Sequence, residues 1–196
     1  MNLIHMISDA GDTAVLIPLA ALLVIMLWRY QAWAAASTLF VALAACASVM
    51  IVLKLVLIAC GQSWHAGVVS PSGHASMSAT IYGALGIVAA RQMPLWRPAI
   101  IICSWLLIAA IAASRIVLGA HTYAEVGLGF LVGAGSLWLF AVRYFRLRPP
   151  PVNLALLATL TLATIVLLNG THLPAEFVLR KLALFGRTST GVCVEG

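Results

Sequence analysis

Long, uninterrupted apolar runs constrain the fold of this chain more than any other feature of its sequence. Six runs follow one another, at about residues 13–28, 33–60, 75–90, 98–117, 123–142 and 153–169. They are continuously apolar and do not alternate with polar residues, which indicates membrane-embedded helices and not the strands of a barrel. A helix of about 20 residues crosses the apolar part of a bilayer. The sequence therefore predicts an all-α integral membrane bundle of six transmembrane helices.

Composition agrees with lipid as the main surroundings of this bundle. Of the 196 residues, 63% are hydrophobic and only 8% are charged, which lies far outside the range of soluble domains. The net charge of +6 comes without a basic, aromatic-rich cluster, so we expect no nucleic-acid partner. The whole chain, residues 1–196, is predicted to form a single membrane-embedded domain.

Arginines in the connecting segments predict the orientation of the bundle. The first, third and fifth connections share six of them, namely Arg29, Arg91, Arg97, Arg143, Arg146 and Arg148. The positive-inside rule places these connections in the cytoplasm and segments 61–74 and 118–122 on the outer side. Cations in the tail, residues 171–196, oppose this assignment, and residues 175–185 of that tail have the pattern of a short interfacial helix. The expected location is a bacterial inner membrane, with the active site on the periplasmic side.

Three charged residues lie within the apolar runs: Lys54, Arg115 and Glu125. An ionised side chain at mid-bilayer costs at least ~3 kcal/mol on insertion scales, so such residues are rare and usually functional. Each lies near the end of its run, and the three ends face the same side, beside His74 and His121. The alternative is that Lys54 and Arg115 extend toward lipid headgroups, with Glu125 as their counter-ion. Their convergence on two histidines favours a functional site.

The segment Pro71-Ser72-Gly73-His74 opens the third run. Ser72 is a good N-cap, and ordinary turn chemistry would explain the segment by itself. A capped helix N-terminus is also an anion site, because its free N–H groups and positive dipole end face the ligand. Gly73 would allow the backbone to approach a phosphate closely, and His74 would stand in the first turn beside it.

The fourth run ends near Ser114-Arg115, and the fifth begins with His121 and Glu125, four residues apart. Arg115 carries a planar fork of donors suited to phosphate oxygens. At this spacing on a helix, Glu125 can accept the Nδ1 proton of His121 and leave Nε2 free to attack. The alternative is a buried polar pair that closes a helix end.

Pro71-Ser72-Gly73-His74 and Ser114-Arg115-x5-His121, with Lys54 upstream, resemble the signature motifs of the type 2 phosphatidic acid phosphatase superfamily. The resemblance covers about residues 54–129. It implies a six-helix membrane enzyme that removes phosphate from a lipid phosphate or diphosphate without a metal or other cofactor. His121 would be the nucleophile that forms a phosphohistidine, and His74 would protonate the leaving oxygen. The groups implied to hold the phosphate oxygens are Lys54, Ser72, Gly73, Ser114 and Arg115, so the catalytic segments would be about residues 54–74 and 114–125.

The first motif departs from the family pattern, which is a lysine, six residues and then Arg-Pro. Gly61-Gln62 stands at that position here, so one phosphate-binding cation is missing and part of the electrostatic stabilisation with it. Gln62 and His65 are candidate neutral donors in its place. The acid after His121 is usually an aspartate and here is Glu125, whose longer arm can still orient the imidazole.

The predicted function is hydrolysis of a membrane lipid phosphate at the outer face. Candidate substrates are polyprenyl diphosphates such as undecaprenyl diphosphate, phosphatidylglycerol phosphate, phosphatidic acid and lipid A phosphate. One alternative is a phosphotransferase that discharges the same phosphohistidine onto the hydroxyl of a second lipid. Another is a catalytically weak homologue that binds anionic lipid, which the missing arginine favours and the two histidines oppose. The sequence leaves the choice of lipid and the oligomeric state open.

Overall fold

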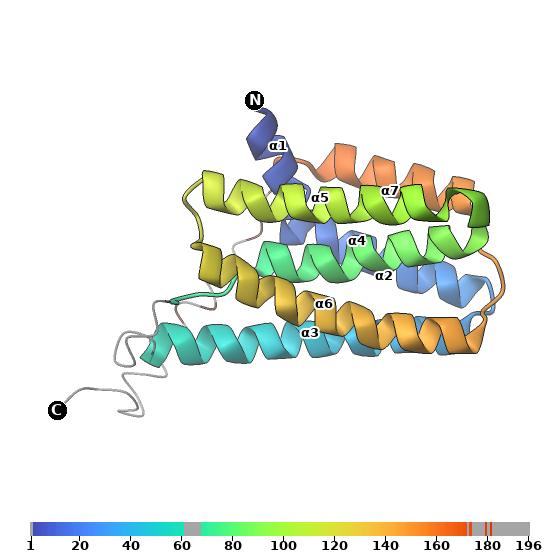
Figure 1. Cartoon of the computed structure of the whole chain (residues 1–196), viewed down its shortest axis with the longest axis horizontal. Helices are drawn as coiled ribbons and strands as arrows, with labels where there is room; N and C mark the ends of the chain where they lie inside the picture. Colours follow the sequence, from blue (N-terminus) through green and yellow to red (C-terminus); the bar gives the residue numbers. More distant parts are fainter. Residues whose placement is uncertain (1, 61–67, 172, 174–178, 180, 182–196) are drawn as a thin grey trace.

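The computed structural model describes residues 2–60, 68–171, 173, 179 and 181. Over these residues the chain is helical and contains no β-strand, which confirms the predicted all-α class (Figure 1). The elements in chain order are α1 (Leu3–Asp9), α2 (Thr13–Arg29), α3 (Trp33–Cys60), α4 (Gly73–Gln92), the 3-10 helix η1 (Pro94–Trp96), α5 (Arg97–Val117), α6 (Tyr123–Leu147) and α7 (Leu154–Leu168).

Each predicted apolar run corresponds to one helix, from α2 to α7. Helix α6 continues to Leu147, beyond the predicted end at 142, because Tyr144 still faces the core and is buried. Side-chain caps mark the starts of α2, α4, α6 and α7, and the capping residues are Asp12, Ser72, Thr122 and Asn153. The predicted interfacial helix at 175–185 lies outside the described residues, apart from Leu179 and Lys181.

Helix α1 is an element that the apolar runs do not predict. It has seven residues, and its axis is bent by 46° from that of α2. It packs against α5. At its end, the carbonyl of Ala10 accepts a hydrogen bond from the hydroxyl of Tyr82 in α4 at 2.7 Å. The start of the chain is therefore held against α4 and α5.

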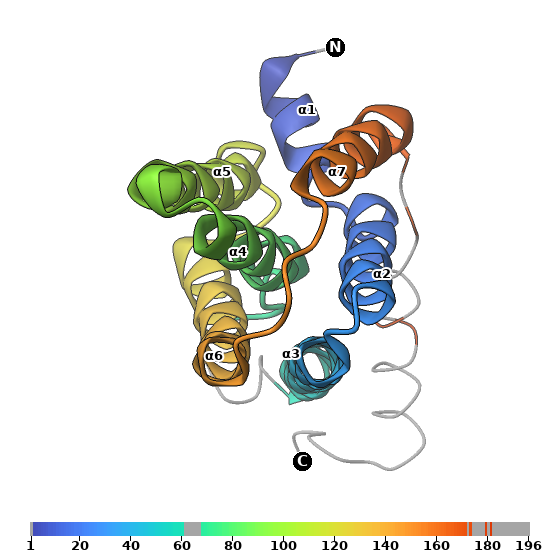
Figure 2. The same cartoon turned by 90° about the vertical axis from the view of Figure 1, so that its right-hand side faces the viewer.

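Helix α4 lies at the centre of the bundle, with α2, α3, α5 and α6 packed around it (Figure 2). Most of its residues are buried. Glycines of α6 allow close contact, since a Cβ on Gly129 or Gly133 would collide with the backbone carbonyl oxygen of Ser72 or Ser76. This four-residue glycine spacing is typical of membrane helices that pack backbone to backbone.

Three helical segments of the described chain are long and apolar enough to cross a membrane, or up to four if the bent α1–α2 pair is one span. The three cover Trp33–Ile58, Pro94–Val117 and Tyr123–Leu147. Helix α4 is not among the three. It is surrounded by other helices of the protein, so its side chains can be less apolar than those that face lipid. Helix α7 has 15 residues, fewer than the roughly 20 needed to span. These are the helices of a membrane protein, and the count of six spans remains a prediction.

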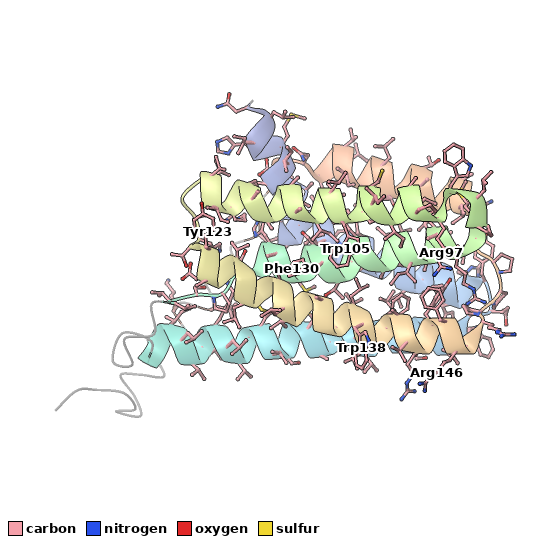
Figure 3. The ribbon with its side chains drawn as sticks, viewed as in Figure 1. Arg97, Trp105, Tyr123, Phe130, Trp138 and Arg146 are labelled. Atoms are coloured by element: carbon pink, nitrogen blue, oxygen red, sulfur yellow. The ribbon has the colours of Figure 1, made fainter. Side chains whose placement is uncertain are left out.

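The bundle has two chemically different ends. Asp12 lies at the start of α2 and Glu125 at the start of α6, and we name this end of the bundle the carboxylate end. The arginines of the connecting segments lie where α2, α4 and α6 end, which we name the arginine end. Arg97 and Arg146 mark the arginine end in Figure 3, and Tyr123 marks the carboxylate end. Segregation of the arginines of the connecting segments to one end is the pattern of helices that cross a bilayer.

Candidate active site

Lys54, His74, Arg115 and His121 lie in or next to four helices at the carboxylate end. Lys54 lies in α3, His74 in the first turn of α4, and Arg115 in the last turn of α5. His121 precedes α6, and Glu125 lies in its first turn. The hydrogen bonds described below link α3 and α6 to the segment that opens α4, whereas that of Arg115 links α5 to α1.

His121 and Glu125 form a buried pair. Nδ1 of His121 lies 3.2 Å from Oε2 of Glu125, and the two side chains are 7% and 9% exposed. A capping box fixes the carboxylate: the N–H of Thr122 donates to the same Oε2 at 3.0 Å, and the N–H of Glu125 donates to Oγ1 of Thr122 at 3.3 Å. The carboxylate favours the tautomer with a proton on Nδ1. Nε2 is then the basic nitrogen of the ring.

The other carboxylate oxygen of Glu125 binds the segment before α4. Oε1 accepts from the N–H groups of Val69 and Ser70, each at 2.9 Å. The backbone carbonyl of Glu125 accepts from the N–H of Ser72 at 3.0 Å. Hydrogen bonds to an ionised carboxylate are stronger than those between neutral groups. One acidic residue therefore ties the start of α4 to the start of α6.

Lys54 is a buried cation, with 4% of its surface exposed. Its Nζ donates to Oγ of Ser70 at 3.2 Å, and its Cε would lie 3.9 Å from a Cβ placed on Gly73. Lys54 thus reaches the N-terminus of α4. Ser72 caps that helix, as predicted, through an Oγ that accepts from the N–H of Ala75 at 3.4 Å. A cation beside a helix N-terminus is suited to binding an anion.

The N-terminal segment supplies two contacts that the motifs did not predict. Nη1 of Arg115 donates to Oγ of Ser8 at 2.8 Å, and Nε2 of His74 lies 3.8 Å from Oδ2 of Asp12. Oδ1 of Asp12 also accepts from the N–H of Ala14 at 2.9 Å and so caps α2. Ser8 and Asp12 are both buried. The signal available in the sequence was a pair of aspartates near the start of a chain that has only five carboxylates.

Gly11 explains how the N-terminal segment can lie so close to His74. A Cβ on Gly11 would lie 3.2 Å from Cδ2 of His74, 3.2 Å from Oγ of Ser78 and 2.5 Å from Cγ2 of Ile111. The last distance is too short for two carbon atoms in contact, so a side chain here would require Ile111 of α5 to move. The missing side chain lets Asp12 approach His74.

Three further residues were predicted to bind phosphate: Ser114, Gln62 and His65. Oγ of Ser114 donates to the carbonyl of Ile111 at 2.6 Å, so its proton is used within α5. Gln62 and His65, the candidate replacements for the missing arginine, lie outside the described residues. Over the part of the chain that the structure describes, no group of three or more His, Cys, Asp or Glu side chains could hold a metal ion.

Comparisons with known proteins identify the family. A model of the PAP2 superfamily matches residues 56–149, which include both histidine motifs and Glu125 but not Lys54. An uncharacterized 22.5 kDa protein in the cps region of Klebsiella pneumoniae is 32% identical over 197 residues, covering 91% of this chain and 89% of that protein. No solved structure matches. The chain belongs to the PAP2 superfamily.

Proposed function

We propose that this protein is a lipid phosphate phosphatase that works through a phosphohistidine on His121 without a metal ion. The observation that carries the proposal is the contact between Nδ1 of His121 and the buried carboxylate of Glu125, which leaves Nε2 for attack. Two cations, Lys54 and Arg115, and a second histidine, His74, lie at the same end of the bundle. Membership of the PAP2 superfamily supports phosphatase chemistry, and the apolar helices support a lipid substrate.

In the first step, Nε2 of His121 attacks the phosphorus atom, and the bond from phosphorus to the lipid oxygen breaks. The electron pair of that bond stays on the oxygen, which takes a proton from His74. Glu125 stabilises the positive charge of the imidazole as the P–N bond forms. Lys54, Arg115 and the N–H groups at the start of α4 stabilise the charge on the other phosphate oxygens.

In the second step, a water molecule attacks the phosphohistidine. His74, now neutral, takes a proton from the water as the new P–O bond forms. The P–N bond breaks, its electron pair returns to Nε2 of His121, and inorganic phosphate leaves. Asp12 is a positioning residue in this scheme, because a carboxylate near an imidazole stabilises the protonated form that His74 needs for the first step.

The proposed substrate is a polyprenyl diphosphate or a phospholipid-type phosphate at the outer face of the membrane. The candidate site lies at the carboxylate end, and the positive-inside rule puts the arginine end in the cytoplasm. A lipid phosphate group could then reach the site at the depth of its own headgroup, while its tails stay in the bilayer. The proposed location is the inner membrane of a bacterium, with the site on the periplasmic side.

The test is phosphate release by the purified full chain in detergent, with a chelator present. The substrates are undecaprenyl diphosphate, phosphatidylglycerol phosphate, phosphatidic acid and lipid A phosphate. His121→Ala and His74→Ala are compared with His5→Ala, which changes an exposed histidine of α1. We expect release that survives the chelator and His5→Ala and is abolished by the other two changes. Release that requires a divalent metal, or that survives His121→Ala, would overturn the proposal.

The same experiment separates the alternative functions. Phosphate that appears on the hydroxyl of a second lipid, and not in solution, would identify a phosphotransferase. Binding of a lipid phosphate without turnover in a folded protein would identify a lipid-binding homologue. Hydrolysis and transfer both need a nucleophile, which the buried pair of His121 and Glu125 would supply. Lipid binding alone does not need such a pair.

A further inference from the structure

A second cluster of cations surrounds a hollow at the arginine end. The hollow has a volume of about 280 Å³, and we name it the arginine pocket; its lining residues are Ala90, Arg91, Pro94, Arg97, Phe145 and Arg148. Arg91 comes from the last turn of α4, Arg97 from the first residue of α5, and Arg148 from the C-cap of α6. Three elements therefore bring three arginines to one hollow.

The arginine pocket lies far from the candidate active site. Helix α4 connects the two, with His74 in its first turn and Arg91 in its last. The difference between positions 74 and 91 corresponds to about 25 Å of helix. That length approaches the roughly 30 Å thickness of the apolar part of a bilayer. The two clusters of cations therefore face opposite surfaces of the proposed membrane protein.

Aromatic rings hold two of the arginines in place. Cζ of Arg91 lies 5.3 Å from the ring centroid of Tyr144, and its Nη1 donates to the backbone carbonyl of Tyr144 at 3.2 Å. Cζ of Arg97 lies 5.6 Å from the ring centroid of Phe145. Cation–π contacts orient a guanidinium group and supply no counter-ion. The positive charge of both groups is thus available to a ligand.

Charge at the arginine end is one-sided. The described carboxylates, Asp9, Asp12 and Glu125, belong to α1, its link to α2, and the start of α6, so the described chain places no acidic side chain at the arginine pocket. Like charges around one hollow repel one another, and the repulsion grows where lipid lowers the dielectric constant. An anion in the hollow would replace this repulsion with attraction to all three arginines.

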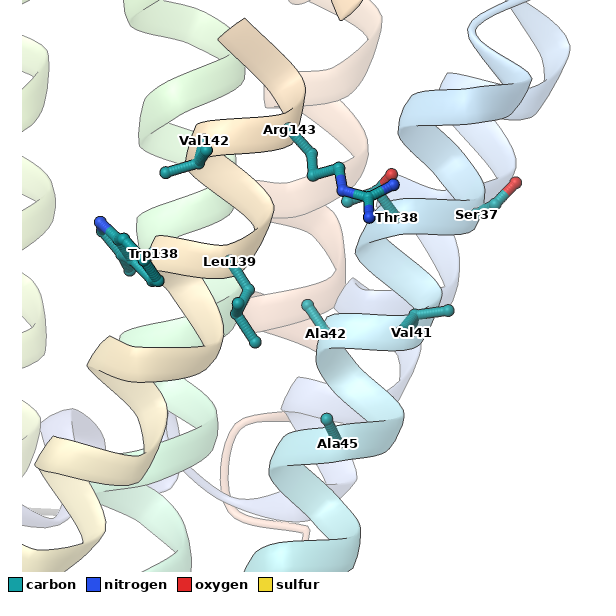
Figure 4. A pocket seen from close by; sticks show the side chains of 9 residues that line it. All are labelled: Ser37, Thr38, Val41, Ala42, Ala45, Trp138, Leu139, Val142 and Arg143. Atoms are coloured by element: carbon teal, nitrogen blue, oxygen red, sulfur yellow. The ribbon is translucent and has the colours of Figure 1, made fainter. Parts of the chain in front are cut away.

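The neighbouring groove between α3 and α6 differs from the arginine pocket. It has a volume of about 490 Å³ and is lined mainly by apolar side chains (Figure 4). Its single arginine, Arg143, extends toward Thr38 in the same view. The cations of the arginine end are therefore not equivalent, because three share one hollow and Arg143 lies along an apolar groove.

We propose that the arginine pocket binds the phosphate group of an anionic phospholipid in the leaflet at the arginine end. Guanidinium forks match phosphate oxygens, and basic pockets between membrane helices bind anionic headgroups. Leu95 and Trp96 lie beside the pocket with 85% and 59% of their surfaces exposed, which places it at headgroup depth and favours a lipid over a soluble phosphate. Its volume is below the roughly 300–1,000 Å³ of sites that enclose whole small molecules. This binding does not depend on the proposed catalysis.

The test measures the Tm of the full chain in detergent during titration with phosphatidylglycerol. Phosphatidylcholine is the zwitterionic reference, and inorganic phosphate is the soluble anion. The double variant Arg97→Gln/Arg148→Gln removes two exposed cations of the pocket and keeps Arg91. The matched control, Arg29→Gln/Arg146→Gln, removes two exposed cations of the same end that do not line the pocket.

We expect phosphatidylglycerol to raise the Tm of the parent and of the control, because a ligand of the folded state stabilises it. The pocket variant should need at least about tenfold more lipid for the same rise. An equal loss in both double variants, or an equal response to phosphatidylcholine, would overturn the proposal. If inorganic phosphate raises the Tm and only the pocket variant loses this rise, the bound phosphate does not have to belong to a lipid, and the proposal of a lipid ligand would be overturned. The single changes Arg97→Gln and Arg146→Gln repeat the comparison if the double variant does not fold.

Discussion

Nε2 of His74 lies 3.8 Å from Oδ2 of Asp12, which belongs to the link between α1 and α2. A carboxylate at this distance stabilises a protonated imidazole, the form that a general acid must have before it gives up its proton. The link between α1 and α2 therefore contacts the candidate site, which the family motifs alone would confine to α3, α4, α5 and α6.

Replacing Asp12 with Asn should lower kcat for lipid phosphates by about tenfold to a hundredfold. Asn keeps the cap of α2 and removes the charge that faces His74. The loss should shrink with p-nitrophenyl phosphate, because its leaving group needs no proton. Measurement of kcat and KM for both kinds of substrate checks this expectation. With p-nitrophenyl phosphate, whose leaving group needs no proton from His74, the double variant Asp12→Asn/His74→Ala should be no slower than His74→Ala, and additive losses would contradict action through His74.

Replacing Glu125 with Gln should lower kcat by about 10²–10⁴-fold and leave KM nearly unchanged. The substitution removes the charge that supports the imidazole of His121. The amide oxygen of Gln can still accept from the N–H groups of Val69 and Ser70, and Lys54 and Arg115, the proposed phosphate-binding cations, remain. Glu125→Asp is the matched variant, since it keeps the charge on a shorter arm. It should retain part of the activity and lose about 1 kcal/mol of stability through a weaker capping box. Steady-state kinetics and thermal unfolding of both variants provide the check, and a parent-like kcat in Glu125→Gln would exclude the proposed role.

Replacing Lys54 with Gln should raise the Ki of inorganic phosphate, as a competitive inhibitor, by about tenfold or more. The side chain is buried beside the start of α4 and would lose its charge there while keeping a donor for Ser70. Lys54→Arg restores a cation at the same position and should restore part of the affinity. A Ki that stays at the parent value in Lys54→Gln would remove this residue from the phosphate site.

Replacing Gly129 with Ala should destabilise the protein by about 1–3 kcal/mol, because a Cβ here meets the backbone carbonyl of Ser72. Activity should fall as well, since Ser72 caps the helix that carries His74. Gly127→Ala is the control on the same helix, where a Cβ has no atom within 4 Å. It should be neutral or stabilising by up to about 1 kcal/mol. Unfolding of both variants in one detergent tests the contrast, and equal Tm values would show that α4 and α6 can move apart freely.

Much of the helical framework followed from the sequence, because the runs are long and end at polar residues. The bounds predicted for α3 agree with the structure, and the four-residue spacing of His121 and Glu125 predicted their contact. Local rules suffice for this contact, since His121 precedes the N-cap of α6 and Glu125 lies in the first turn of the same helix. The central place of α4 did not follow, because apolar runs do not reveal whether protein or lipid surrounds a helix.

The contacts of the N-terminal segment with Arg115 and His74 could not be predicted from the sequence for a different reason. Helix α1 has seven residues, too few for a periodic pattern to stand out. The contact between Ser8 and Arg115 joins residues 107 positions apart, and that of Asp12 with His74 depends on the absence of a side chain at Gly11. Such contacts arise only from packing of distant segments, which no local pattern encodes.

The hydrogen bonds from Val69 and Ser70 to Glu125 join residues 56 and 55 positions apart. The ribosome releases the segment before α4 well ahead of α6, so this segment can take its final shape only after α6 has been synthesised and inserted. Assembly of the proposed active site is then one of the late events of biogenesis. A nascent chain that stops before Tyr123 would hold Lys54, Ser72 and His74 with no carboxylate from α6 to order them.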